Sequence, residues 1–312
     1  MNGIMEILLQ SGKSAIELAL YILLPIMVVM MALMKVLEAK GVLAFVARAL
    51  APVLRPFGIP GIGVFAILQS LLVSFAAPVA TLVIMEKDGT PTRKIAATLA
   101  MVLTISQANV VFPMLTVGLN LWSILLTSLL GGIVASTLTY RYFARSEESE
   151  DSHSTDRAAK VEATHQGLLR TLVDGGQEGV QLALSSIPIL VLTICLVNTL
   201  RATGVISLLE WSLSPALARM HLPAIAVLPI ATKFLAGGTA MMGITIPLIQ
   251  DGSMTSQDLN RIAGLIINPL DLVGVAVLMS AGRRVASVAR PAILGAIVGI
   301  LVRTAVHFIL FR

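Results

Sequence analysis

The sequence predicts an all-α, polytopic membrane protein made of two inverted repeats. Each repeat has a span, an interfacial helix, a re-entrant hairpin, a broken span and a span. Three observations carry this prediction. The chain is 56% hydrophobic and 12% charged, whereas a soluble domain has about 25% charged residues. Apolar stretches of about 20 residues, long enough as helices to cross a hydrocarbon core of about 30 Å, recur along the chain. Prolines and glycines repeat at one fixed offset.

Composition and motifs argue against several functional classes. The formal charge is +5, but the basic residues lie in short connections between apolar runs, where they read as topology signals and not as a nucleic-acid surface. Cys195 is the only cysteine, so neither an internal disulfide nor a cysteine-cluster metal site can form. Gly12, Lys13 and Ser14 imitate a phosphate-binding loop, but Ile7 stands where that loop needs a glycine. No Ser-His-Asp set or paired carboxylate lies in the apolar stretches, so we expect no catalytic residues, no metal and no enzyme.

The internal repeat has an offset of 163 residues. Proline and glycine fix backbone geometry and are sparse, so their coincidence at one offset indicates duplication. The repeat predicts a first membrane unit at 1–143, a disordered linker at 144–170 and a second membrane unit at 171–312. The linker is rich in charged residues and serine, and its His153 and His165 are expected to be solvated. The matched pairs are Pro25 with Pro188, Gly41 with Gly204, Pro52 with Pro215, Pro60 with Pro223, and Asp88-Gly89 with Asp251-Gly252.

Each repeat begins with a span followed by a short amphipathic segment. The first spans are 15–37 and 180–200, and 15–37 is too long for a signal-peptide core. The segments after them carry a polar stripe, which is typical of helices lying in the membrane interface. The stripe residues are Arg48 and Arg55 in the first repeat, and Ser207, Glu210 and Ser214 beside Trp211 in the second.

An interrupted apolar stretch follows in each repeat, at 61–85 and 224–249. The first is broken around Ser74 and Pro78, and the second at Gly237 and Gly238, where a continuous helix would lose stability. The residues alone leave kinked spans and re-entrant hairpins open. Two more apolar stretches close each repeat, at 95–117 and 121–143 in the first and at 262–281 and 291–311 in the second.

Charge counting favours the hairpins. If every stretch crosses the membrane, the Lys and Arg residues divide twelve to nine between the two sides. If the interrupted stretches turn back, each half has three crossings and the second half is inverted, which gives fifteen on the linker side. Cytoplasmic loops collect Lys and Arg, so we expect a cytoplasmic linker and external termini. The six residues opposite are Lys13, Arg201, Arg219, Arg261, Arg303 and Arg312.

The closing spans carry small and aromatic residues. Gly131, Gly132, Ser136, Gly295 and Gly299 permit close helix packing, either within the chain or in a homo-oligomer. A single histidine, His307, is expected to be packed or interfacial. Trp122, Tyr140 and Tyr142 fit interfacial anchors.

The order of these parts, given twice, resembles the membrane core of concentrative nucleoside transporters. It also resembles the wider group that shares the nucleoside-recognition or gate domain, including spore-maturation-type proteins and the membrane part of ferrous-iron transporters. The most telling stretches are 41–60 with 204–223, and the run 235–240 at the second hairpin. The resemblance implies a transport-type fold without naming a substrate. Where the nucleoside transporters carry Gln-Thr-Glu in their first hairpin, this chain has Gln69-Ser70-Leu71; Thr232-Lys233-Phe234 stands where their second-hairpin acid would be.

Polar residues deep in the apolar stretches are the candidate site. Proline and side-chain amides together free backbone groups that can bind a solute or ion. In one reading these side chains line a solute path at the midplane; in the other they cap freed carbonyls or bond between helices. The candidate substrate-binding residues are Gln69, Ser70, Ser74, Ser106, Gln107, Asn109, Thr232, Lys233, Thr239, Asn268 and Asp271.

Lys233 and Asp271 have one further expected relationship. In the hairpin topology both helices enter from the same side and both residues lie nine positions in, roughly 13 Å deep. An isolated charge at that depth costs at least about 2.5 kcal/mol on insertion scales. We therefore expect an intramembrane ion pair; the alternative is that Lys233 snorkels to the interface while Asp271 faces a wet cavity.

The sequence thus favours a secondary-transporter-like protein of the bacterial inner membrane. It would move a small polar solute, with nucleoside-like compounds among the candidates, through a midplane site between two hairpins. The alternative is a non-transporting membrane scaffold or regulatory subunit with a gate-type fold. The expected partners are the lipid bilayer and the solute, with a homo-oligomer open and no nucleic acid. No cofactor is expected beyond a coupling ion such as sodium or a proton.

Overall fold

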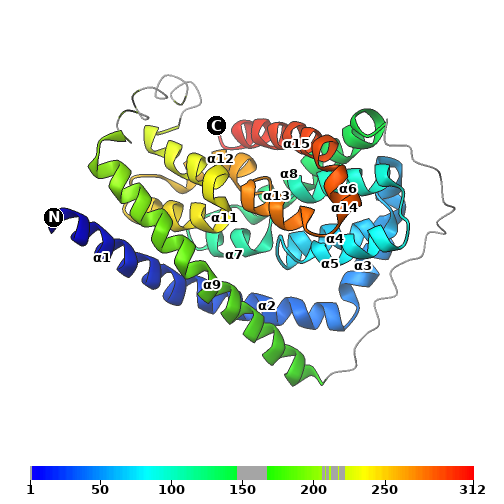
Figure 1. The fold of residues 1–312 in the computed structure, drawn as a ribbon, viewed down its shortest axis with the longest axis horizontal. Coiled ribbons are helices and arrows are strands. Elements are labelled where there is room, and N and C mark those ends of the chain that lie inside the picture. Colours follow the sequence, from blue (N-terminus) through cyan, green and yellow to red (C-terminus); the bar gives the residue numbers. More distant parts are fainter. Residues whose placement is uncertain (1, 146–166, 206–207, 209–210, 212–216, 218–221) are drawn as a thin grey trace.

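The computed structural model describes residues 2–145 and 167–312, except 206–207, 209–210, 212–216 and 218–221. Regular structure in these residues is helical throughout (Figure 1). The expected all-α membrane architecture is confirmed. Most of the linker at 144–170 and of the second interfacial segment at 204–223 lies outside the described residues.

The first repeat follows the predicted order of parts. Its first span is one long rod with a π-helical turn in the middle, and its interfacial segment is a helix. The hairpin has two short helical arms, and the next span is broken into two pieces. The elements are α1 (Asn2–Glu17), η1 (Leu18–Leu23), α2 (Leu24–Ala39), α3 (Val42–Leu54), η2 (Arg55–Phe57), α4 (Gly61–Leu72), α5 (Pro78–Lys87), α6 (Thr92–Thr104), α7 (Ala108–Leu115), α8 (Leu121–Leu138) and η3 (Thr139–Phe143).

The second repeat has the same order, again with an interrupted hairpin and a broken span. Its first helix begins at Leu168, inside the stretch predicted as linker and well before the predicted span at 180–200. The elements are α9 (Leu168–Ala202), η4 (Ala224–Ala226), α11 (Val227–Gln250), α12 (Ser256–Ile266), α13 (Leu272–Met279), α14 (Arg283–Ser287) and α15 (Ala289–Leu310).

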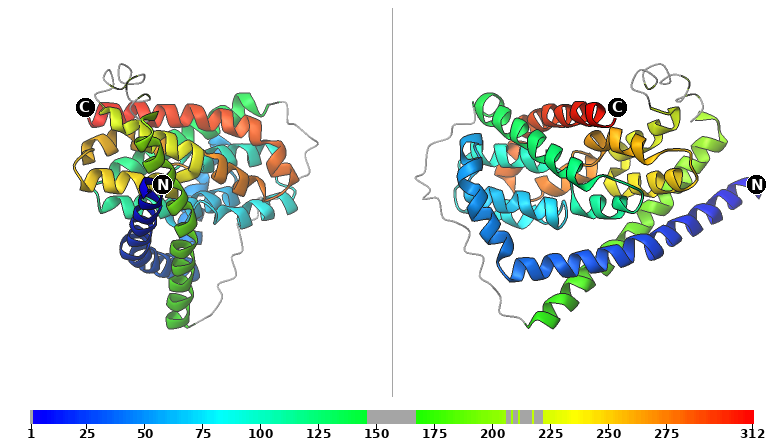
Figure 2. Two further views of the ribbon diagram at one scale, coloured as in Figure 1. Left: turned by 60° about the vertical axis from the view of Figure 1, so that its left-hand side comes forward. Right: turned by 180° about the vertical axis from the view of Figure 1, so that it is seen from behind.

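The two long first spans cross on one side of the molecule. In Figure 1 the α1–α2 rod lies beneath the bundle and α9 crosses it diagonally to reach the level of α12, and Figure 2 shows from behind that α1 projects beyond the bundle. Gly175 and Gly179 of α9 face the backbone of α2 near Ala32 and Met27 so closely that a Cβ at either position would clash. Glycines four apart let the two rods approach at this crossing.

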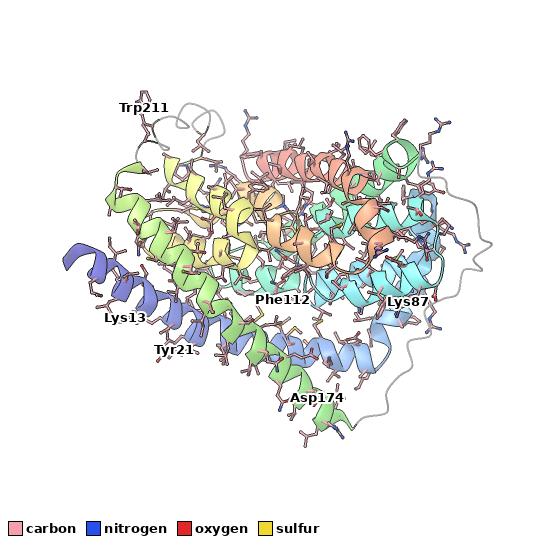
Figure 3. The ribbon with its side chains drawn as sticks, in the orientation of Figure 1. Lys13, Tyr21, Lys87, Phe112, Asp174 and Trp211 are labelled. Atoms are coloured by element: carbon pink, nitrogen blue, oxygen red, sulfur yellow. The ribbon has the colours of Figure 1, made fainter. Side chains whose placement is uncertain are left out.

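Hydrogen bonds at the two ends of the bundle show that the repeats are inverted. At one end, Arg284 donates to the carbonyl of Thr90 at 2.7 Å, which joins α14 to the loop after the first hairpin. At the other end, Asn260 donates to the carbonyl of Gly118 at 2.8 Å. The loop at 88–91 therefore lies at one end, whereas its repeat equivalent at 251–255 leads into α12 at the other. Figure 3 shows Lys87, which precedes the loop at 88–91, at one end of the long axis and Lys13 and Trp211 toward the other.

We call the end with Lys87, Thr90 and Arg284 the first end, and the end with Gly118, Asn260 and Phe311 the second end. The first end collects basic residues, as the hairpin topology predicts. They are Lys87, Arg93, Lys94, Arg141, Arg283, Arg284 and Arg290.

Both interrupted stretches fold back on themselves. In the first, Thr81 of α5 donates to Gln69 of α4 at 2.6 Å, which holds the two arms side by side. In the second, α11 leaves the helical conformation at Gly237, whose φ is 87° and ψ is 178°. Both arms of α11 pack into one hydrophobic cluster with the second-end residue Met254, whereas both arms of the first hairpin pack into the first-end cluster with Val285. Each hairpin therefore enters from its own end.

Six helices in the described part of the chain are long and apolar enough to cross a membrane. One of them is α11, which qualifies by length but turns back at Gly237. The broken span of α12 and α13 is not among the six, and its two pieces, of 11 and 8 residues, are each too short to cross alone. Three crossings per half remain the arrangement that the packing supports.

Glycines on the closing spans pack within the chain. Gly131 of α8 and Gly299 of α15 face each other's backbone, and Gly295 faces Thr139 and the carbonyl of Ala135. The internal-packing alternative is thus confirmed for these residues. His307 is fully buried, as expected of a packed histidine, and its ring nitrogens lie 2.8 Å from Thr127 Oγ1 and 2.6 Å from the carbonyl of Asn260.

Candidate functional site

The two broken spans meet at the centre of the bundle. The chain between α6 and α7 is extended at Ile105 and Gln107, and the chain between α12 and α13 is non-helical from Ile267 to Asp271. Gln107 Nε2 donates to the carbonyl of Asn268 at 3.3 Å, which joins the two breaks directly. The amide side chains on the breaks therefore satisfy freed backbone groups, as one of the two readings of the sequence expected.

Arg303 of α15 joins the same two breaks from their other side. Its guanidinium donates to the carbonyl of Thr104 at the end of α6, to the carbonyl of Ile267 at the end of α12 at 3.2 Å, and to Ser106 Oγ at 2.9 Å. These are the negative ends of two helix dipoles, which favour a cation. The side chain is fully buried, so the sequence-based assignment of Arg303 to an external connection was wrong. The assignment failed because it treated every arginine as a loop charge, although this one lies well inside an apolar span.

The second hairpin reaches the breaks through two glycines. A Cβ at Gly238 would clash with Gln107 Nε2, and a Cβ at Gly237 would lie 3.4 Å from Asp271 Oδ1. The positive φ of Gly237 also favours glycine for backbone reasons. The small residues at this tip therefore allow the hairpin to touch both broken spans.

A cavity of about 270 Å³ opens between these parts. Its walls come from both hairpin tips, both broken spans and the two crossing rods. Apolar side chains dominate, and polar groups converge from the breaks, which is the usual build of a small-molecule site. The lining residues are Leu23, Met27, Phe75, Gln107, Asn109, Leu182, Ala183, Ser185, Ser186, Ile189, Ala236, Gly237, Gly238, Thr239, Met242, Asp271 and Val273.

Lys233 and Asp271 form the expected ion pair. Nζ of Lys233 bonds Oδ2 of Asp271, and the side chains are 0% and 3% exposed. Asp271 Oδ1 also accepts the backbone N–H of Gly274 at 2.8 Å, so the carboxylate caps the N-terminus of α13. The prediction of a pair is confirmed, and the snorkelling alternative is wrong because the ammonium group is buried behind the hairpin tip.

One cavity polar atom is unsatisfied. Asn109 is 8% exposed and lines the cavity, and its Oδ1 has no hydrogen-bond partner among the described residues. A buried amide oxygen without a partner is costly. A ligand that reaches this oxygen would satisfy it by donating a hydrogen bond.

The structure divides the eleven candidate residues into three groups. Gln107, Asn109, Thr239 and Asp271 line the cavity. Ser106, Lys233 and Asn268 lie behind its wall and bond the residues that shape it. The other four are not in the lining: Gln69 is engaged by Thr81 within the first hairpin, and Ser70, Ser74 and Thr232 are buried elsewhere.

Sequence reasoning missed several residues of this site. Phe75 was passed over beside Ser74, and Ser185 and Ser186 were read as part of an ordinary span although they line the cavity. Arg303 was the most visible of the missed signals, since an arginine within a 20-residue apolar stretch is itself a reason to expect a buried partner.

Two inverted repeats whose broken helices surround a central cavity are the architecture of many secondary transporters. The chain is therefore a transporter-like membrane protein by its fold. Residues 20–121 match the family described as "Gate: Nucleoside recognition", and the resemblance expected from the sequence is confirmed over that stretch.

Individual proteins also resemble this chain. Spore maturation protein B of Bacillus subtilis (strain 168) is 35% identical over 79 residues, which is 25% of this chain and 44% of that protein. The chain thus covers less than half of that relative's length. CNTnw in an inward-facing, substrate-bound state and a CNTnw variant in an outward-facing state each have a TM-score of 0.70 and 16% identity, and each match covers 99% of this chain and 83% of theirs. At this identity the likeness shows the fold alone.

Proposed function

We propose that this protein is a secondary transporter of the bacterial inner membrane that moves a small, polar and uncharged solute through the central cavity. The observation that carries the proposal is the unsatisfied Asn109 Oδ1 in a mainly apolar cavity whose one carboxylate is neutralised by Lys233. Such a site favours a neutral molecule with an apolar or aromatic face and at least one hydrogen-bond donor. Nucleosides and nucleobases are compounds of this kind.

The proposed orientation places the first end in the cytoplasm. Basic residues concentrate there, and cytoplasmic loops of membrane proteins collect Lys and Arg. The first hairpin would then enter from the cytoplasm and the second from outside. Their tips, represented by Phe75 and Thr239, line the same cavity.

A ligand screen tests the proposal. The melting temperature of the purified protein in detergent is measured with nucleosides, nucleobases, amino acids and sugars, because a ligand that binds only the folded state raises it by mass action. A compound at about 100 times its Kd stabilises by about 2.7 kcal/mol. The matched control is Asn109→Leu, which keeps the side-chain size and removes the acceptor. A hit should lose its effect in this variant and should show counterflow in proteoliposomes.

The second candidate function is a membrane scaffold or regulatory subunit without transport. The likeness to spore maturation protein B favours it over other non-transport roles. It predicts that no small polar compound raises the melting temperature and that the Asn109→Leu variant keeps full biological function. A stabilising ligand that depends on Asn109 would exclude it.

A further inference from the structure

We infer that Lys233 is a built-in cation of the central cavity: its ammonium group holds the place beside Asp271 that an alkali-metal ion would take. Solute binding at this site would then require no sodium ion. The inference deepens the proposed function, because it assigns the ionic requirement of the same cavity.

The donor groups around this position suit a hard monovalent cation. Asp271 contributes a carboxylate, and its side chain lines the cavity. The break at Gly237 also brings non-helical backbone to the same place, against Asp271. Carboxylate, amide and carbonyl oxygens are the ligands of hard cations, and unwound helices are where transporters bind sodium.

In this protein the side chain of Lys233 supplies the positive charge beside Asp271. Lys233 Nζ is fully buried and bonded to Asp271 Oδ2, so one positive and one negative charge cancel locally. A second cation there would leave an excess positive charge in a low-dielectric site, which is unfavourable. The other buried cation of the described bundle, Arg303, faces the helix C-termini at Thr104 and Ile267 and adds no negative charge. Lysine and a free cation are therefore alternative occupants.

The ion pair between Lys233 and Asp271 also affects how the second hairpin can move. Lys233 belongs to the first arm of α11 and Asp271 is the N-cap of α13. The second hairpin is thus bonded to the broken span by an ion that cannot dissociate from the protein. Closure of this hairpin would not depend on external sodium, and solute movement would carry no alkali cation.

The test is the salt dependence of thermal stability in Lys233→Met. This variant removes the ammonium group but keeps an unbranched side chain of similar length, which leaves Asp271 with a cation-sized vacancy. Melting temperatures are measured in NaCl, LiCl, KCl and choline chloride at equal ionic strength. The wild type should melt at the same temperature in all four salts. Lys233→Met should melt about 3 °C or more higher in NaCl or LiCl than in choline chloride.

The control is Lys233→Met combined with Asp271→Asn, which removes both charges. It should show no preference among the cations. A Lys233→Met variant that ignores the cation would overturn the inference, as would a wild type that sodium stabilises specifically. If Lys233→Met fails to fold in every salt while the double variant folds, no alkali ion replaces the ammonium group and the inference fails. If neither variant can be purified, the wild-type measurement decides alone.

No solute enters this experiment, so its outcome is separate from that of the ligand screen. A negative screen with a cation-dependent Lys233→Met would reject the proposed solute while keeping the built-in cation. A positive screen with a cation-independent Lys233→Met would do the reverse.

Discussion

Arg303 Nη2 donates a hydrogen bond of 2.9 Å to Ser106 Oγ, which joins the last span of the second repeat to the broken span of the first. The same guanidinium bonds the C-terminal carbonyls of α6 and α12. One side chain thus closes both helix breaks on the side away from the cavity, and the helix dipoles replace the carboxylate that a buried arginine usually needs.

Replacement of this arginine should destabilise the fold strongly. Arg303→Met leaves two buried helix ends without donors, so we expect the free energy of unfolding to fall by about 3 kcal/mol and the melting temperature to fall with it. Arg290→Met removes an exposed arginine in the first turn of the same helix and should change the melting temperature little. Equal effects of the two substitutions would show that Arg303 does not hold the breaks together.

Because Lys233 and Asp271 form an ion pair, the losses of stability caused by replacing each of them should not add in the double variant. Lys233→Ala alone leaves a buried unpaired carboxylate, whereas Lys233→Ala with Asp271→Ala removes both charges. We expect the single variant to melt at a lower temperature than the double variant, because uncompensated buried charge costs about 3–5 kcal/mol. Melting temperatures of both single variants and the double variant complete the cycle. Simple addition of the two single losses would contradict the pair.

Gly237 should tolerate no side chain at the hairpin tip. Its φ of +87° is strained for any other residue, and its Cβ would face Asp271. Gly237→Ala is expected to lower stability by about 1–3 kcal/mol. Gly12→Ala in α1, where a Cβ meets no atom within 4 Å, should instead be neutral or slightly stabilising. Thermal melts of the two variants side by side measure the difference.

The inversion of the repeats can be tested in cells. Asp88 and Ser253 are exposed residues of equivalent loops that lie at opposite ends of the bundle. In a Cys195→Ser background, Ser253→Cys should react with a membrane-impermeant thiol reagent in intact cells. Asp88→Cys should react only after permeabilisation. Labelling of both positions from outside is the result that the inverted arrangement forbids.

Much of the fold could be predicted from the sequence because its signals are local. Apolar length defines spans, and the matched prolines and glycines mark equivalent turns in the two repeats. Charge asymmetry was enough to choose hairpins over spans at 61–85 and 224–249. The pairing of Lys233 with Asp271 was predicted correctly, but the depth count behind it was not, because α12 begins at Ser256 and ends at Ile266, before Asp271.

The candidate site was predicted only in part, because position along a helix does not tell which way a side chain faces. Gln69 and Gln107 looked equivalent as buried amides, yet Gln69 is engaged by Thr81 within its hairpin while Gln107 bonds Asn268 and lines the cavity. Ser185 and Ser186 reach the cavity because of how α9 crosses the bundle. Nothing in their immediate sequence indicates that crossing.

The sequence by itself determined that this is a membrane protein of two related halves with interrupted helices, since hydropathy, repeat offset and charge bias are properties of short stretches. Only the tertiary structure decided which interruptions meet, that Arg303 closes both of them, and that Asn109 keeps a free acceptor in the cavity. These relationships depend on helix rotation and on contacts between residues more than 150 positions apart, such as Ser106 with Arg303. Packing of the whole bundle sets these relationships, because a helix can direct polar groups inward only where a neighbouring group forms hydrogen bonds with them.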